Sequence, residues 1–114
     1  MIKIVKIKKL ISCDPFSREE TFNHYLNIWR AEGSLDKVNR EHAHPEVYCV
    51  EGNLYLFNGN KRAMFLFANG VDEMEVDYRD EFIPPYIIEM NNSGKGQTIE
   101  NAVYRFGGLK EFVL

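Results

Sequence analysis

Residues 58–62, with the sequence Asn-Gly-Asn-Lys-Arg, form the segment whose residue types and spacing most strongly suggest chemistry. The segment joins two apolar runs, which predicts a strand that turns tightly into a helix. The first N–H groups of a helix lack partners within it and carry partial positive charge, so they receive phosphate readily. Gly59 would let a ligand approach the backbone closely, and Lys61 and Arg62 would add positive charge. The alternative is an ordinary turn in which Asn60 caps the helix and the basic side chains are solvated.

A second candidate is the pair His42 and His44, which lies close in sequence to Glu41 and Glu46. Imidazole and carboxylate groups suit metal binding or general acid–base chemistry. The His-x-His pair lacks a clear third ligand, so the alternative is a loop with solvated side chains, and we predict no metal site.

The two cysteines, Cys13 and Cys49, form no Cys-x-x-Cys motif. Neither a zinc site nor a disulfide framework is therefore predicted, although one disulfide between them stays open.

Composition indicates one small globular domain covering residues 1–114. Of these residues, 45% are hydrophobic, which is enough for a core without a metal or a disulfide framework. The formal net charge of -3 excludes a generally basic nucleic-acid-binding protein. No apolar run approaches the ~20 residues that span a membrane, and no signal-like segment follows Met1. We therefore expect no membrane partner and a cytoplasmic location.

The elements that must position these residues follow from periodicity and turn chemistry. Residues 2–8 alternate apolar and basic residues, which predicts a half-buried strand with its lysines outward. A capping box of Ser17 and Glu20 begins a helix that stops before Gly33. Residues 34–46 are expected to form a loop with at most a short helical turn. The remaining predicted elements are a hairpin of strands 47–50 and 54–57, an all-round apolar helix over 63–68, strands 74–78 and 86–90, and a helix over 98–105.

The predicted fold class is α+β, a small mixed sheet with two packed helices and a C-terminal appendage. Six of the aromatic residues are assigned to its core. They are Phe22, Tyr25, Trp29, Phe57, Phe65 and Phe67.

Over residues 2–79 the sequence resembles the ParB/sulfiredoxin superfamily. The resemblance is carried by a proline-led strand, a hairpin, and a Gly-x-x-Arg turn that opens a helix. In this sequence these residues are Pro45-Glu46-Val47, Gly52, Tyr55, Phe57, Gly59-x-x-Arg62-Ala63 and Gly70, preceded by Leu10-Ile11, Asp14-Pro15 and Arg18. Residues 80–114 have no counterpart in the pattern, and residues 84–114 form the appendage.

The resemblance implies a nucleotide or nucleic-acid phosphate site made by Arg18, Gly59, Asn60, Lys61 and Arg62. It also implies nuclease or phosphoryl-transfer activity, with a nucleoside triphosphate and Mg²⁺ as the candidate cofactor. Two positions depart from the pattern. Lys61 stands where His or Arg is usual, and Asn60 stands where sulfiredoxins place a reactive cysteine, which excludes sulfiredoxin chemistry because an amide cannot replace a thiolate. The alternative function is a non-enzymatic protein–protein interaction module, which the acidic net charge favours over duplex DNA binding.

The appendage holds more apolar side chain than one short strand and one short helix hide by themselves. Residues 86–114 therefore predict a homodimer interface, with packing over the chain's own sheet as the alternative.

Overall fold

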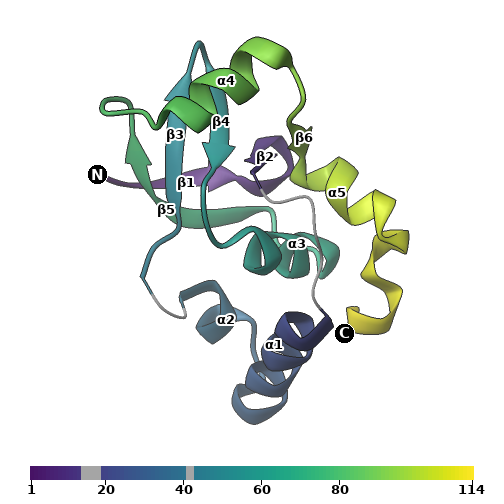
Figure 1. Cartoon of the computed structure of the whole chain (residues 1–114). Coiled ribbons are helices and arrows are strands. Elements are labelled where there is room, and N and C mark those ends of the chain that lie inside the picture. Colours follow the sequence, from purple (N-terminus) through teal and green to yellow (C-terminus); the bar gives the residue numbers. More distant parts are fainter. Residues whose placement is uncertain (14–18, 41–42) are drawn as a thin grey trace.

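The computed structural model describes residues 1–13, 19–40 and 43–114 (Figure 1). The strands are β1 (Ile2–Lys6), β2 (Ile11–Ser12), β3 (Glu46–Val50), β4 (Asn53–Leu56), β5 (Glu73–Arg79) and β6 (Gln97–Thr98). The helices are α1 (Glu19–Glu32), α2 (Asp36–Arg40), α3 (Asn60–Ala68), α4 (Pro85–Ser93) and α5 (Ile99–Arg105), with short 3-10 segments η1 (Ile7–Lys9) and η2 (Gly107–Phe112). None of the helices in these ranges is long and apolar enough to cross a membrane.

Within the described ranges the strands form one mixed six-stranded sheet in the order β1-β5-β3-β4-β2-β6. The β3–β4 hairpin is antiparallel, as predicted, and it is flanked by β5 and β2, which run parallel to β3 and β4 respectively. β1 and β6 close the two edges in antiparallel pairings. The predicted α+β class with a mixed sheet is therefore confirmed.

Two layers of side chains cover opposite faces of this sheet. The main core joins α1, α2, α3, α5 and η2 to the sheet, so more than the two predicted helices pack on it. A smaller cluster on the other face holds Cys13, Tyr48, Tyr55 and Ile87, and α4 covers it. In Figure 1, α4 lies beside the β3–β4 hairpin at the top, α3 lies near the middle, and α1 and α2 lie at the opposite end of the molecule.

Helix α3 is the centre of the main core. Every side chain from Asn60 to Leu66 is buried, and Phe67 and Ala68 are half-buried. This result confirms the predicted burial of the apolar helix, and it extends burial to the polar first turn. The helix α1 stops at Gly33, which has a left-handed φ of 70°, as the sequence predicted. Its predicted cap at Ser17 lies outside the described residues.

The prediction of a strand over residues 86–90 is wrong, because these residues lie in α4. The proline at its first position, Pro85, has no N–H to lose there and a φ suited to a helix start. A short apolar run does not separate strand from buried helix by itself. The helix buries Ile87 and ends at Gly94, whose φ is 66°.

The predicted orientation of the first strand is also wrong. Ile2 and Ile4 are 52% and 64% exposed, while Ile7, which lies beyond β1 in η1, is fully buried. Two of the aromatic core assignments need correction as well, because Phe57 is 44% exposed and Trp29 is only partly buried.

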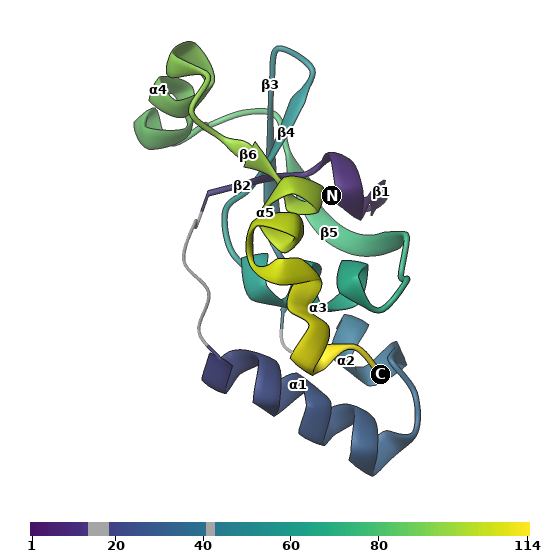
Figure 2. The ribbon, with the colours of Figure 1, turned by 90° about the vertical axis from the view of Figure 1, so that its right-hand side faces the viewer.

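The C-terminal segment completes the core of its own chain. Ile99, Val103, Leu109 and Phe112 are all buried in the main cluster. Asn69, at the end of α3, donates a side-chain hydrogen bond to the Phe112 carbonyl at 3.0 Å. Figure 2 shows α5 and the C-terminal segment passing α3 and reaching α1. Packing on the chain's own core, the alternative to a dimer, accounts for these side chains.

Candidate functional site

The turn between β4 and α3 is built around a glycine. Gly59 is the N-cap of α3 with a left-handed φ of 75°, and it supplies no side-chain cap to the first turn. A Cβ atom at this position would lie 2.9 Å from Cγ of Pro45, which is too close. Both the backbone conformation and the packing therefore require glycine.

The start of β3 holds this turn in place. Oδ1 of Asn58 accepts a hydrogen bond from the Glu46 N–H at 2.7 Å, and the Phe57 N–H donates to the Glu46 carbonyl at 2.9 Å. With Pro45 packed on Gly59, these bonds fix the point at which α3 begins. The proline-led strand and the Gly-x-x-Arg turn are thus physically one unit.

Hydrogen bonds of Asn60 connect the end of β2 to the start of α3. Its buried Oδ1 accepts from Oγ of Ser12 at 2.8 Å and from the Cys13 N–H at 3.3 Å. The amide oxygen of Asn60 therefore bonds Ser12 and Cys13 and does not cap the first turn of α3. The predicted cap at Asn60, which belonged to the ordinary-turn alternative, is wrong. Burial raises the pKa of the neighbouring Cys13 thiol to about 11, which favours the neutral thiol at neutral pH.

Lys61 and Arg62 are buried, with exposed fractions of 8% and 4%. The expectation of a solvated basic pair, which belonged to the ordinary-turn alternative, is therefore wrong. Nη2 of Arg62 donates to the carbonyl of Ala43, two residues before Pro45, at 3.2 Å. Burying a cation is costly without compensating groups, and both Lys61 and Arg62 interact with other groups of the protein.

Two neighbouring cavities open against this turn. The larger has a volume of about 390 Å³ and lies between the turn and α1; it is lined by Thr21, Tyr25, Phe57, Asn58, Gly59, Asn60 and Lys61. The smaller has a volume of about 300 Å³; it is lined by Tyr25, Ala43, Pro45, Asn58, Gly59 and Arg62. The structure thus brings together four of the five predicted site residues, and the fifth, Arg18, lies outside the described ranges.

The sequence did not single out three residues that line the larger cavity, namely Thr21, Tyr25 and Phe57. Tyr25 and Phe57 had been assigned to the core. Tyr25 does pack on Phe65, with ring centroids 5.5 Å apart, yet it also forms a wall of both cavities. Helical periodicity indicates which face of α1 is buried, but it does not show that this face borders an opening.

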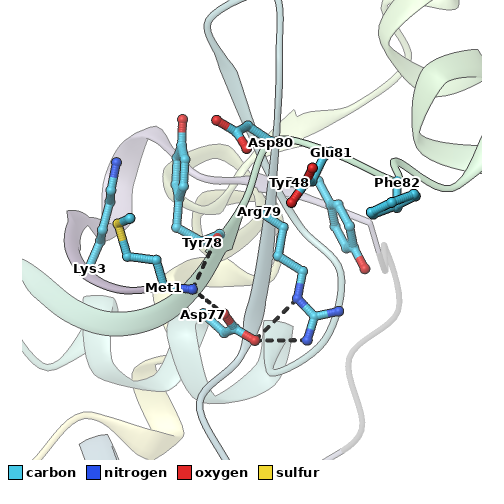
Figure 3. Close-up of a pocket in the computed structure, with 9 residues that line it drawn as sticks. All are labelled: Met1, Lys3, Tyr48, Asp77, Tyr78, Arg79, Asp80, Glu81 and Phe82. Carbon is cyan, nitrogen blue, oxygen red and sulfur yellow. Dashed lines mark hydrogen bonds and ion pairs between the residues drawn. The ribbon is translucent and has the colours of Figure 1, made fainter.

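A larger cavity, of about 550 Å³, lies away from the turn; it is lined by the start of β1, by Tyr48 of β3, and by the end of β5 with the residues that follow it (Figure 3). Its cations already have partners. The Met1 amino group and Arg79 both pair with Asp77, at 3.0 and 2.8 Å, and Nζ of Lys3 lies 3.9 Å from the centre of the Tyr78 ring. We place the candidate phosphate site at the turn despite its smaller cavities, because a glycine, two basic residues and the N-terminus of α3 meet there.

Of the two candidate histidines, His44 contacts a carboxylate. Nε2 of His44 lies 3.0 Å from Oε2 of Glu75 in an exposed pair, and His42 is outside the described residues. The ranges that the structure describes contain no cluster of three or more His, Cys, Asp or Glu residues arranged for a metal ion.

Comparisons of the chain with protein-family models, with curated proteins and with solved structures found no match.

Proposed function

We propose that this protein binds phosphate groups of a nucleotide or a nucleic acid through the Gly59–Arg62 turn. The observation that carries the proposal is the burial of Lys61 and Arg62 at the start of α3, beside two open cavities. A phosphate in these cavities would meet positive charge and the partial positive charge of the helix N-terminus. The resemblance to the ParB/sulfiredoxin superfamily supports the same site.

The shape and charge of the molecule favour a nucleotide or a single strand over duplex DNA. The formal net charge is -3, whereas duplex binding draws its affinity from a broad basic surface. The cavities beside the turn have volumes in the range of small-ligand pockets. Phe57, which is 44% exposed at the rim, offers a flat ring for a base.

The structure assigns no catalytic residue. Cys13 is a buried thiol, and the described residues around the turn supply no set of carboxylates for Mg²⁺. In our proposal Mg²⁺ accompanies the phosphates of a nucleoside triphosphate, without a protein site of its own. Phosphoryl-transfer or nuclease activity stays a prediction.

Calorimetric titration with ATP, CTP, GTP and inorganic triphosphate tests the proposal. We expect saturable binding of at least one of these ligands, weakened about tenfold or more in Lys61→Gln and Arg62→Ala because a charge-assisted contact is lost. Lys95→Gln, an exposed lysine distant in sequence, is the matched control and should bind like the wild type. Thermal unfolding of each variant checks that the fold is intact. The proposal is wrong if none of the ligands binds at millimolar concentration, or if folded variants bind unchanged.

An interaction module is the second candidate function. It is favoured by apolar side chains that stay exposed within the predicted homodimer segment 86–114: Tyr86, Ile88, Tyr104, Val113 and Leu114. These exposed apolar side chains are fewer than the sequence suggested, because other apolar side chains of the segment are buried in the core of its own chain.

A further inference from the structure

We propose that the free edge of β1 pairs with β1 of a second copy of this chain, forming a two-fold symmetric dimer with one continuous sheet. β1 is the last strand at its edge of the sheet, and its extensive contacts are with β5. The proposal is independent of phosphate binding, and it places the interface at the opposite end of the sequence from residues 86–114.

The hydrogen-bond pattern shows which backbone groups face the free edge. The Tyr78 N–H donates to the Met1 carbonyl, and the Ile7 N–H donates to the Asp72 carbonyl, both at 2.8 Å. In an antiparallel pair, bonded residues alternate with residues that point away. The odd-numbered residues of β1 therefore bond β5, and the N–H and C=O groups of Ile2, Ile4 and Lys6 point outward.

The charged side chains that normally protect an edge strand are turned back over the sheet. Lysines on an edge discourage pairing with another chain when they project from it. Here Nζ of Lys6 is held by Oε1 of Glu73 at 2.6 Å, and Nζ of Lys3 lies over the Tyr78 ring. Both partners belong to β5, on the inner side of β1. The side chains left on the exposed face at this edge are those of Ile2 and Ile4.

One register of β1 with β1 of the second copy makes all the outward backbone hydrogen bonds and also keeps like charges apart. If Ile4 lies opposite Ile4 of the second copy, Ile2 lies opposite Lys6, and every outward N–H and C=O of these residues meets a partner. In this register Lys3 lies opposite Val5, so no lysine faces a lysine. A shift of the two-fold axis to Lys3 would place like charges opposite each other, which is destabilising. The isoleucines become a cross-strand apolar contact on the exposed face.

This self-complementary pattern is the reason to choose a second copy over an unrelated peptide. A five-residue strand gives a small interface, so the dimer should dissociate on dilution. Light scattering over a concentration series should therefore show a shift from monomer to dimer.

Amide hydrogen exchange on the wild-type protein tests the pairing directly. The amides of Ile2, Ile4 and Lys6 should exchange slowly at high micromolar concentration and at least tenfold faster after dilution to mainly monomer. The amides of Lys3 and Val5, which bond β5, are internal controls and should change little. The proposal would be overturned if the even- and odd-numbered amides exchanged at equal rates at every concentration.

Two substitutions separate this edge from the C-terminal segment. Ile4→Lys places two ammonium groups opposite each other and should give a monomer at every concentration, with unchanged circular dichroism because Ile4 is already exposed. Ile88→Lys makes the same change at an exposed isoleucine of α4 and should leave the dimer intact. A dimer that survives Ile4→Lys, a dimer lost only in Ile88→Lys, or a wild-type protein that stays monomeric at high micromolar concentration would show that β1 is not the interface.

Discussion

Single residues at the β4–α3 turn owe their roles to how deeply the chain buries them. Lys61 and Arg62 are placed against the turn by the core of α3, and Asn60 is occupied by Ser12 and Cys13. The sequence predicted the turn and its residue types because glycine and a basic pair are local signals. It did not predict the burial of the basic pair, because burial depends on Pro45 and α1, which are distant in sequence.

Gly59→Ala should destabilise the protein more than Gly52→Ala. Both glycines have a left-handed φ, 75° and 83°, which costs an alanine about 1–2 kcal/mol. A Cβ at Gly52 would meet nothing within 4 Å, whereas one at Gly59 would contact Pro45 at 2.9 Å. Urea denaturation measures both free energies of unfolding. Equal losses of unfolding free energy in the two variants would show that Pro45 moves aside freely.

Cys13 should resist alkylation at neutral pH. Burial favours its neutral thiol and raises its pKa from 9.0 to about 11, so the reactive thiolate is scarce until the pH approaches that value. The same shift means that the native state holds this proton more tightly than the unfolded state. Its contribution to stability is therefore present below pH 9 and is lost as the pH rises towards 11.

Iodoacetamide labelling read by mass spectrometry checks this expectation. Cys49, which is only partly buried, is the comparison within the same chain and should be labelled first. Faster labelling of Cys13 than of Cys49 at pH 7 would contradict the assigned burial.

Secondary-structure elements were predictable where the signal was local. The β3–β4 hairpin, α3, β5 and α5 follow from turn residues and apolar runs. The structure adds a cap that was not predicted, because the Thr98 side chain accepts from the Asn101 N–H. The helical state of α4 and the orientation of β1 were not predictable in this way. α4 has a short apolar run that fits either structure, and the orientation of β1 depends on its place at the edge of the sheet, beyond the helices that would cover its isoleucines.

Phe65→Ala should cost about 3–5 kcal/mol of stability, because the ring of Phe65 is fully buried at the centre of α3. Phe82→Ala is the matched control, since its ring is 92% exposed and surface changes are usually within about 0.5 kcal/mol. Phe67→Ala should fall between them because Phe67 is half-buried. Chemical denaturation midpoints give the order, and similar midpoints for Phe65→Ala and Phe82→Ala would contradict the placement of α3.

At the scale of the whole molecule, both ends of the chain are built into one core. β1 pairs with β5, β2 pairs with β6, and η2 reaches α1. Composition predicted a single domain, but strand order and the packing of the C-terminal segment arise from long-range contacts that no local pattern encodes.

Truncation after Phe106 should unfold the protein. It removes the buried side chains of Leu109 and Phe112, each of which contributes about 2–5 kcal/mol, and together they approach the stability of a small domain. Truncation after Phe112 is the control, because it removes only the exposed Val113 and Leu114 together with the Leu114 N–H bond to Asn69. Circular dichroism distinguishes the outcomes. A folded 1–106 fragment would show that η2 is dispensable for the core.

The pairing of early strands with late ones has a consequence for biosynthesis. The Leu10 carbonyl accepts from the Ile99 N–H at 2.8 Å, so this contact forms only after Ile99 has been synthesised. At roughly 5–20 residues per second, a nascent chain therefore spends several seconds with its first strands unpaired on the ribosome. During that interval Ile2, Ile4, Ile7 and Leu10 form an exposed apolar segment, which is where we expect a cotranslational chaperone to engage the emerging polypeptide.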